Sequence, residues 1–244
     1  MSPRRTLATA ARVLRQLRHD RRTLGLIFFV PCLLLIVVRY VFDGQQEVFD
    51  SFAPLVLGIF PLTVMFLVSS IATLRERTTG TLDRLMTMPI AKLDFILGYA
   101  LAFSVVALVQ AGLASAVVLG LLRVPVAGGT ALVLIGAVLA AILGTAFGLF
   151  VSAFAATEFQ AVQFMPAFIF PQLLTCGLFV ARDHMEKVVQ WFADVMPMTY
   201  SVDALKQITL HSGWSGTLAR DFAVVTGYAL AVLVLGAVTI RRRD

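Results

Sequence analysis

The chain has 244 residues, of which 59% are hydrophobic and only 14% are charged, and its formal net charge is +6. A soluble domain is about half apolar and about a quarter charged, so this composition excludes one. Several stretches reach the roughly 18 uncharged residues that a helix needs to cross a bilayer, and they lack the alternation of β-barrel strands. We therefore predict an all-α polytopic membrane protein in which residues 1–244 form a single transmembrane domain.

Residues 1–23 precede the first apolar stretch and combine a basic face with an apolar one. Leu7, Ala10, Leu14 and Leu17 share one side of a helical projection, and the arginines lie mostly elsewhere. This pattern is typical of an interfacial helix along the inner leaflet. A disordered basic tail that only sets orientation is the alternative. No small-residue cleavage site follows the first apolar stretch, so we expect that stretch to remain in the mature protein.

Six transmembrane helices are predicted from the apolar stretches. They cover residues 24–42, 52–74, 95–122, 131–155, 162–181 and 219–240. The basic residues orient them, because cytoplasmic loops carry an excess of Lys and Arg. Most of the 20 basic residues lie before residue 23, between residues 75 and 92, or at 241–243, whereas the loop after the first span is acidic. We predict that both termini and residues 75–94, the charged insert, are cytoplasmic. Orientation and attraction to anionic membrane lipid account for the positive charge, so no nucleic acid partner is expected.

Small residues recur every four positions in the fourth span. This stripe consists of Gly136, Ala140, Gly144, Gly148, Ser152 and Ala156, and a shorter one in the third span consists of Gly112, Ala116 and Gly120. Small residues at this spacing let two helix backbones approach closely. We expect both stripes to pack within the subunit, with dimer contacts as the alternative.

The second and fifth spans instead combine prolines with large, adaptable side chains. Prolines loosen a helix, and aromatic and Met side chains form apolar surfaces that adapt to different molecules. Such a surface suits a passage for bulky amphipathic molecules, although core packing or lipid contact explains any single residue equally well. The predicted path residues are Phe60, Met65, Phe66, Phe164, Met165 and Phe168.

The longest outer loop, residues 182–218, is not uniformly polar. Its apolar residues recur with partly helical spacing up to Pro197, and a second such run starts there. We predict an outer re-entrant segment of two short amphipathic helices before the last span, which includes Trp191, Phe192, Pro197 and Tyr200. Irregular backbone is tolerated at that depth only where protein or water covers it.

Chemistry that would power transport is missing from the sequence. There is no GxxxxGK[ST] phosphate-binding loop, His19, His184 and His211 lie outside the spans, and nothing reads as a nucleophile with a base. Ionisable residues are expected to be nearly absent from the spans: Arg39 lies near an outer end and Glu158 in an inner turn. Ion-coupled carriers usually keep an acid or His in mid-membrane. An ion-coupled secondary carrier and a membrane-integral enzyme or scaffold are thus the weaker alternatives to a transporter driven by a partner.

Residues 75–85 read Arg-Glu-Arg-Thr-Thr-Gly-Thr-Leu-Asp-Arg-Leu and are followed by Pro89 and Gly98. This arrangement resembles the signature that follows the second span of ABC-2-type ABC transporter permeases, including daunorubicin-resistance permeases. Residues 171–179, Trp191, Phe192 and residues 197–206 resemble the second signature of that family. The chain departs from it at Val180-Ala181, where many members carry a proline, and at Lys206, where Arg is common.

The resemblance implies the transmembrane subunit of an ATP-driven exporter in a bacterial cytoplasmic membrane. Such a subunit is not itself an enzyme: it binds no cofactor, and ATP and Mg are bound by a separate ABC ATPase subunit, present in two copies. The permease would form a homodimer or pair with a paralogue. Hydrophobic drugs or lipid-like molecules are the expected cargo, with polysaccharides or lipid-linked glycans as the alternative.

The resemblance also assigns a role to the charged insert, which would contain the coupling helix that docks on the ATPase. Charged side chains can form charge-assisted contacts with the partner while leucines pack. A passive loop that fixes topology is the alternative. The residues implied in coupling are Arg75, Glu76, Arg77, Gly80, Thr81, Leu82, Asp83, Arg84 and Leu85.

Overall fold

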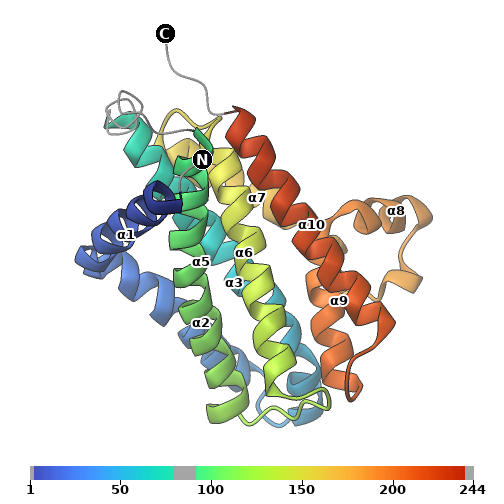
Figure 1. Cartoon of the computed structure of the whole chain (residues 1–244). Coiled ribbons are helices and arrows are strands. Elements are labelled where there is room, and N and C mark those ends of the chain that lie inside the picture. The colour runs from blue at the N-terminus through green and yellow to red at the C-terminus, as the bar shows by residue number, and fades with distance from the viewer. Residues whose placement is uncertain (1–2, 80–91, 240–244) are drawn as a thin grey trace.

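The computed structural model describes residues 3–79 and 92–239, and within these ranges the regular structure is entirely helical (Figure 1). The helices are α1 (Pro3–His19), α2 (Arg21–Val41), α3 (Gln46–Thr78), α5 (Lys92–Ala116), α6 (Thr130–Ser152), α7 (Glu158–Thr175), α8 (Lys187–Val195), α9 (Pro197–Leu210) and α10 (Gly216–Thr239). A π-helical turn, η1 (Val117–Leu121), extends α5, and a 3-10 turn, η2 (Arg182–His184), precedes α8. The predicted all-α architecture is confirmed.

Five of these helices are long and apolar enough to cross a membrane: α2, α3, α5 with η1, α6 and α10. They coincide with five of the predicted spans. The stretch predicted as a span at 162–181 is helical only as far as Thr175, and this helix, α7, is not among the five. Glutamines at 160, 163 and 172 and two prolines lower its hydropathy. The count of six spans stays a prediction.

Helix α3 is the longest element and runs through the middle of the bundle. Its 33 residues correspond to about 50 Å at 1.5 Å per residue, well beyond the ~30 Å hydrocarbon core. The helix continues through Pro54 and Pro61. It also continues past Leu74, where the sequence predicted its end, to Thr78. The first residues of the charged insert therefore form the last turn of this helix.

The most extensive helix contact joins α3 to α6. The backbone of α3 lies directly on the small residues of α6: an added Cβ at Gly144 would collide with the Leu62 carbonyl, and one at Gly148 with the Phe66 carbonyl and Ser69 Oγ. Ser69 Oγ also donates a hydrogen bond of 3.1 Å across the seam to the Thr145 carbonyl. The prediction that this stripe packs within the subunit is confirmed from Gly136 to Ser152, whereas Ala156 lies beyond the end of α6 and is exposed.

The corresponding prediction for the third span is wrong. Ala116 and Gly120 are exposed, no atom lies within 4 Å of a Cβ added at Gly120, and the nearest at Gly112 is 3.9 Å away. The buried face of α5 combines alanines with larger side chains such as Tyr99 and Phe103. The rotation of α5 in the bundle leaves the predicted stripe off this face.

The predicted N-terminal helix is present as α1, and it packs mainly against α5. Its buried face differs from the predicted one, because Leu7 is 59% exposed whereas Thr9 and Val13 are buried with Ala10 and Leu17. Gly98 of α5 admits this contact, since an added Cβ would lie 2.6 Å from Thr9 Cβ. Whether α1 lies along the inner leaflet stays a prediction.

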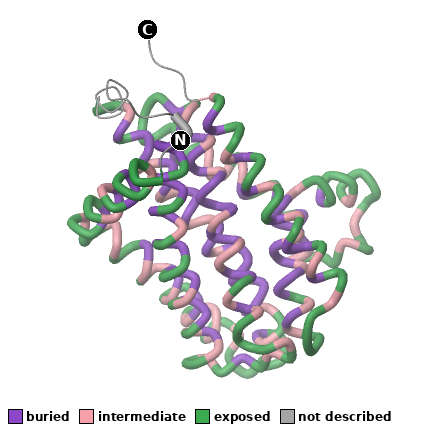
Figure 2. The backbone as a smooth tube through the Cα atoms, viewed as in Figure 1, coloured by how far each residue is buried: buried purple, intermediate pink, exposed green. Residues whose placement is uncertain are grey.

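The ends of the bundle differ in character (Figure 1). The last turn of α3, the turn between α6 and α7, and the end of α10 lie together at one end, near α1. The turn before α6 and the turn between α9 and α10 lie at the other, where the Gly128 amide donates to the Ile208 carbonyl. Helices α8 and α9 stand to one side of the bundle, and α8 is largely exposed (Figure 2). We call the end of the bundle that holds the last turn of α3 the Arg75 end.

Candidate functional site

The Arg75 end gathers the described part of the predicted coupling segment. Arg75, Glu76 and Arg77 lie on the last turn of α3. The other six residues predicted to couple, Gly80, Thr81, Leu82, Asp83, Arg84 and Leu85, lie outside the described residues. The helix therefore runs without interruption from the membrane-spanning part of α3 into the start of the charged insert. The coupling role of all nine residues stays a prediction.

Glu76 is bound inside the bundle by the N-terminal helix. Its side chain is only 4% exposed and pairs with Arg12 of α1, whose Nη1 lies 3.0 Å from Oε1 and whose Nη2 lies 3.2 Å from Oε2. Arg12 Nη2 also donates to Tyr99 Oη of α5 at 2.7 Å. Burial by itself lowers the pKa of Arg12, but the hydrogen bond to Glu76 and the neighbouring negative charge raise it above its ordinary value. The pair links α1, α3 and α5.

The two arginines of this turn, Arg75 and Arg77, contact α7 and α6. Arg75 Nε donates to Glu158 Oε1 at 2.7 Å and Arg75 Nη2 to Oε2 at 3.1 Å, although both side chains are about half exposed. Arg77 donates to the Ser152 carbonyl, at the end of α6. Arg75 thus contacts α7, Glu76 contacts α1 and, through Arg12, α5, and Arg77 contacts α6. A displacement of this turn would therefore disturb contacts with four other helices.

The sequence pointed to the three α3 residues but not to their partners. The sequence pattern places Arg12 with the arginines outside the apolar side of α1, Tyr99 within the predicted span 95–122, and Glu158 in an inner turn. Arg12 follows the buried Ala10 and precedes the buried Val13, so its position beside the apolar face was the one available signal. A pairing between residues 64 positions apart leaves no local pattern.

The predicted substrate-path residues of α3 and α7 meet in the structure. The rings of Phe66 and Phe168 lie 6.3 Å apart, and Phe168 is also 6.3 Å from Phe147 of α6. Met65 and Phe66 are fully buried within the subunit, whereas Phe60, Phe164, Met165 and Phe168 are half-buried. Phe60 and the α7 residues are thus the more accessible members of the set, and its role as a path stays a prediction.

The predicted outer segment forms two helices, α8 and α9, separated at Pro197. Trp191 and Phe192 of α8 are 74% and 40% exposed, whereas Pro197 is buried and Tyr200 Oη donates to the Asp194 carbonyl at 2.7 Å. The helices are confirmed, and their re-entrant placement in the outer leaflet stays a prediction.

The expectation that ionisable residues are nearly absent from the spans needs a correction. Asp221, in the predicted span 219–240, is fully buried in the second turn of α10. It accepts hydrogen bonds from Gln207 Nε2 at 2.6 Å and from Arg220 at 3.0 Å. The carboxylate is thus satisfied near a helix end rather than placed in mid-membrane. In the described ranges, no group of three or more His, Cys, Asp or Glu side chains could hold a metal ion.

Comparison with known proteins finds a family model and several relatives that are similar to this chain. A family model described as "ABC-2 type transporter" matches residues 4–210. The chain is 27% identical over 175 residues to the probable multidrug ABC transporter permease YbhR of Escherichia coli K12, which covers 72% of this chain and 48% of that protein. It is 28% identical over 166 residues to the inner membrane transport permease YhhJ of the same organism, covering 68% and 42%.

A eukaryotic relative is also similar. ABC transporter G family member 20 of Dictyostelium discoideum is 24% identical over 206 residues, which cover 83% of this chain and 28% of that protein. The matched part therefore spans about a quarter to a half of the length of these relatives.

Proposed function

Because this chain belongs to the ABC-2 type transporter family and is a transmembrane subunit of an ABC transporter, we propose that it exports hydrophobic drugs or lipid-like molecules. The cargo would leave the cytoplasm or the inner leaflet. The name of the multidrug relative and the aromatic contact between α3 and α7 support apolar cargo. Phe66 and Phe168 would then contribute to the substrate path.

The energy would come from ATP hydrolysed on a separate ABC ATPase subunit, which would also bind the Mg. We propose that two such subunits serve two permease chains, either identical or paralogous, in a bacterial cytoplasmic membrane. The charged insert would dock on the ATPase.

The arrangement at the Arg75 end is the observation that best supports this mechanism. The turn that leads into the insert is bonded to α1 and α5 through Glu76, and to α7 through Arg75. Because the turn is bonded at several points, a displacement of the insert would carry its partner helices with it. Motion of the insert would therefore be passed to α3 and α7, the two helices that carry the predicted path.

The test uses the chain together with its ATPase in inside-out vesicles. Arg84→Glu reverses one charge of the insert, and we expect loss of ATP-dependent accumulation of a hydrophobic fluorescent compound, with membrane insertion unchanged. Lys187→Glu, at an exposed position of α8, is the matched control and should leave transport intact. Full transport by the Arg84 variant would contradict the coupling role.

A further inference from the structure

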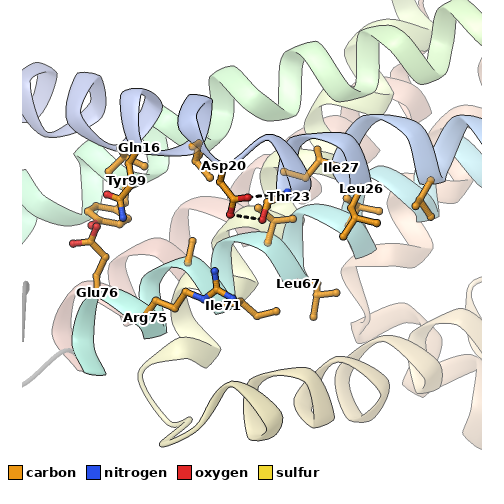
Figure 3. A pocket seen from close by; sticks show the side chains of 16 residues that line it. Gln16, Asp20, Thr23, Leu26, Ile27, Leu67, Ile71, Arg75, Glu76 and Tyr99 are labelled. Atoms are coloured by element: carbon orange, nitrogen blue, oxygen red, sulfur yellow. Dashed lines mark hydrogen bonds between the residues drawn. The ribbon is translucent and has the colours of Figure 1, made fainter. Parts of the chain in front are cut away.

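A cavity of about 460 Å³ lies between α1, α2 and α3, beside the Arg75 end (Figure 3). This volume falls within the range of about 300–1,000 Å³ that is usual for small-molecule sites. None of the six residues predicted to form the substrate path lines it. The cavity is therefore distinct from that group of aromatic and Met side chains, although α2 and the Arg75 end contribute to its lining.

One part of the cavity is apolar. Leu26, Ile27 and Val30 of α2 face Leu67, Val68 and Ile71 of α3 across it. Figure 3 shows Leu26, Ile27 and Leu67 away from the Glu76 and Tyr99 side of the site. An alkyl chain or an aromatic group would gain by burial against these side chains.

The other part is polar, and both arginines there are already neutralised. Arg75 donates two hydrogen bonds to Glu158. Arg12 donates three to the Glu76 carboxylate. An anionic group entering the cavity would have to compete with these bonds. The remaining charged residue of the lining is Asp20.

Asp20 is held in place as the N-cap of α2, and nearby Arg75 partly offsets its charge. Its two oxygens accept hydrogen bonds from Thr23, one from the amide at 3.1 Å and one from Oγ1 at 2.6 Å. These bonds lower the pKa of Asp20, so the carboxylate is ionised at neutral pH. In the described part of the chain no salt bridge engages it. The Arg22 amide also contributes a hydrogen bond, so of the roughly four acceptor sites of a carboxylate at least one remains for a ligand.

We propose that this cavity binds an amphipathic cation, with its apolar part between α2 and α3 and its positive group at Asp20. A charged hydrogen bond to Asp20 would fix the orientation, and the apolar walls would supply most of the affinity. The site is independent of the proposed direction of transport, because it concerns binding to this chain alone.

The test measures photocrosslinking to the full chain in nanodiscs of zwitterionic lipid. The probe is dodecyltrimethylammonium with a diazirine at the end of its alkyl chain, and two counterparts carry a hydroxyl or a sulfate head on the same chain. We expect saturable labelling of peptides from α2 and α3 around Leu26 and Leu67, strongest for the cation. Asp20→Asn should weaken the cationic probe roughly tenfold and leave the neutral one unchanged.

Two further variants complete the test. Leu67→Trp fills the cavity and should abolish labelling by all three probes, whereas Asp43→Asn removes an exposed acid elsewhere and should change nothing. Thermal unfolding checks that each variant is folded, and the near-isosteric Asp20 variant carries the test if Leu67→Trp is not. Equal labelling by the cationic and neutral probes, preference for the sulfate probe, or unsaturable labelling would each overturn the proposal. Loss of transport in the coupling experiment above would not affect it.

Discussion

The α3–α6 seam and the Arg75 end hold the same helix by opposite means. At the seam, glycines bring two backbones into contact, and the stabilisation comes from packing over many atoms, with few polar bonds. At the Arg75 end, single charged side chains span the gaps between helices and meet their partners with directional bonds. Packing of the first kind tolerates no added volume, whereas bonds of the second kind can be exchanged one at a time. Helix α3 is thus fixed in its middle and adjustable at its end.

Adding a methyl group at the seam should have the largest effect. Gly144→Ala places a Cβ against the Leu62 carbonyl, which is backbone and cannot rotate away. We expect a loss of about 3 kcal/mol or more in the free energy of unfolding, because overpacking forces the helices apart. Denaturant or thermal unfolding in detergent measures it.

Gly112→Ala is the matched control, since the nearest atom to its added Cβ is 3.9 Å away. This variant should be neutral or more stable by up to about 1 kcal/mol, because alanine favours helix over glycine. Equal destabilisation by the two substitutions would show that the seam is not close-packed.

The bonds of the Arg75 end should rank by burial. Glu76→Ala leaves Arg12, which is 33% exposed, without its carboxylate, and we expect a loss of about 1–3 kcal/mol. A double-mutant cycle with Arg12→Ala should give a coupling energy above about 1 kcal/mol.

The cycle for Arg75→Ala and Glu158→Ala should give under about 1 kcal/mol and fade with added salt, because both side chains are about half exposed. Equal coupling in the two pairs would remove the distinction between buried and exposed bonds at this end.

The smallest effect on stability is expected at Asp203 in α9. It tests whether buried charges on the predicted outer side are stabilised as well as those at the Arg75 end. Burial raises the pKa of Asp203, nearby Asp221 adds to this, and the salt bridge of 2.7 Å to Arg182 opposes it. A raised acid pKa means that folding favours the protonated form, so stability should fall as the pH rises above the ordinary Asp value. Asp203→Asn should flatten this dependence of the melting temperature on pH. A wild-type melting temperature that rises across that range would contradict the sign.

Sequence reasoning located the elements better than the contacts between them. The spans could be predicted because a membrane helix needs a continuous apolar stretch, and the start of α9 because proline is favoured at the first position of a helix. The stripe of α6 was recognised from its spacing, but the same spacing in α5 misled, because only the rotation of a helix in the bundle decides which face is covered. The partners of Glu76 depend on a fold that brings α1 beside α3 and α5, which no local pattern encodes.

The docking of α1 on α5 constrains the order of events during synthesis. The face of α1 that holds Ala10, Val13 and Leu17 is covered by a helix that begins at Lys92. At roughly 5–20 residues per second, several seconds pass between the emergence of the two. Throughout that interval the apolar side of α1 needs another cover, and the lipid surface is the nearest one. We therefore expect the N-terminal helix to remain on the bilayer until α5 emerges, where Gly98 admits its close contact.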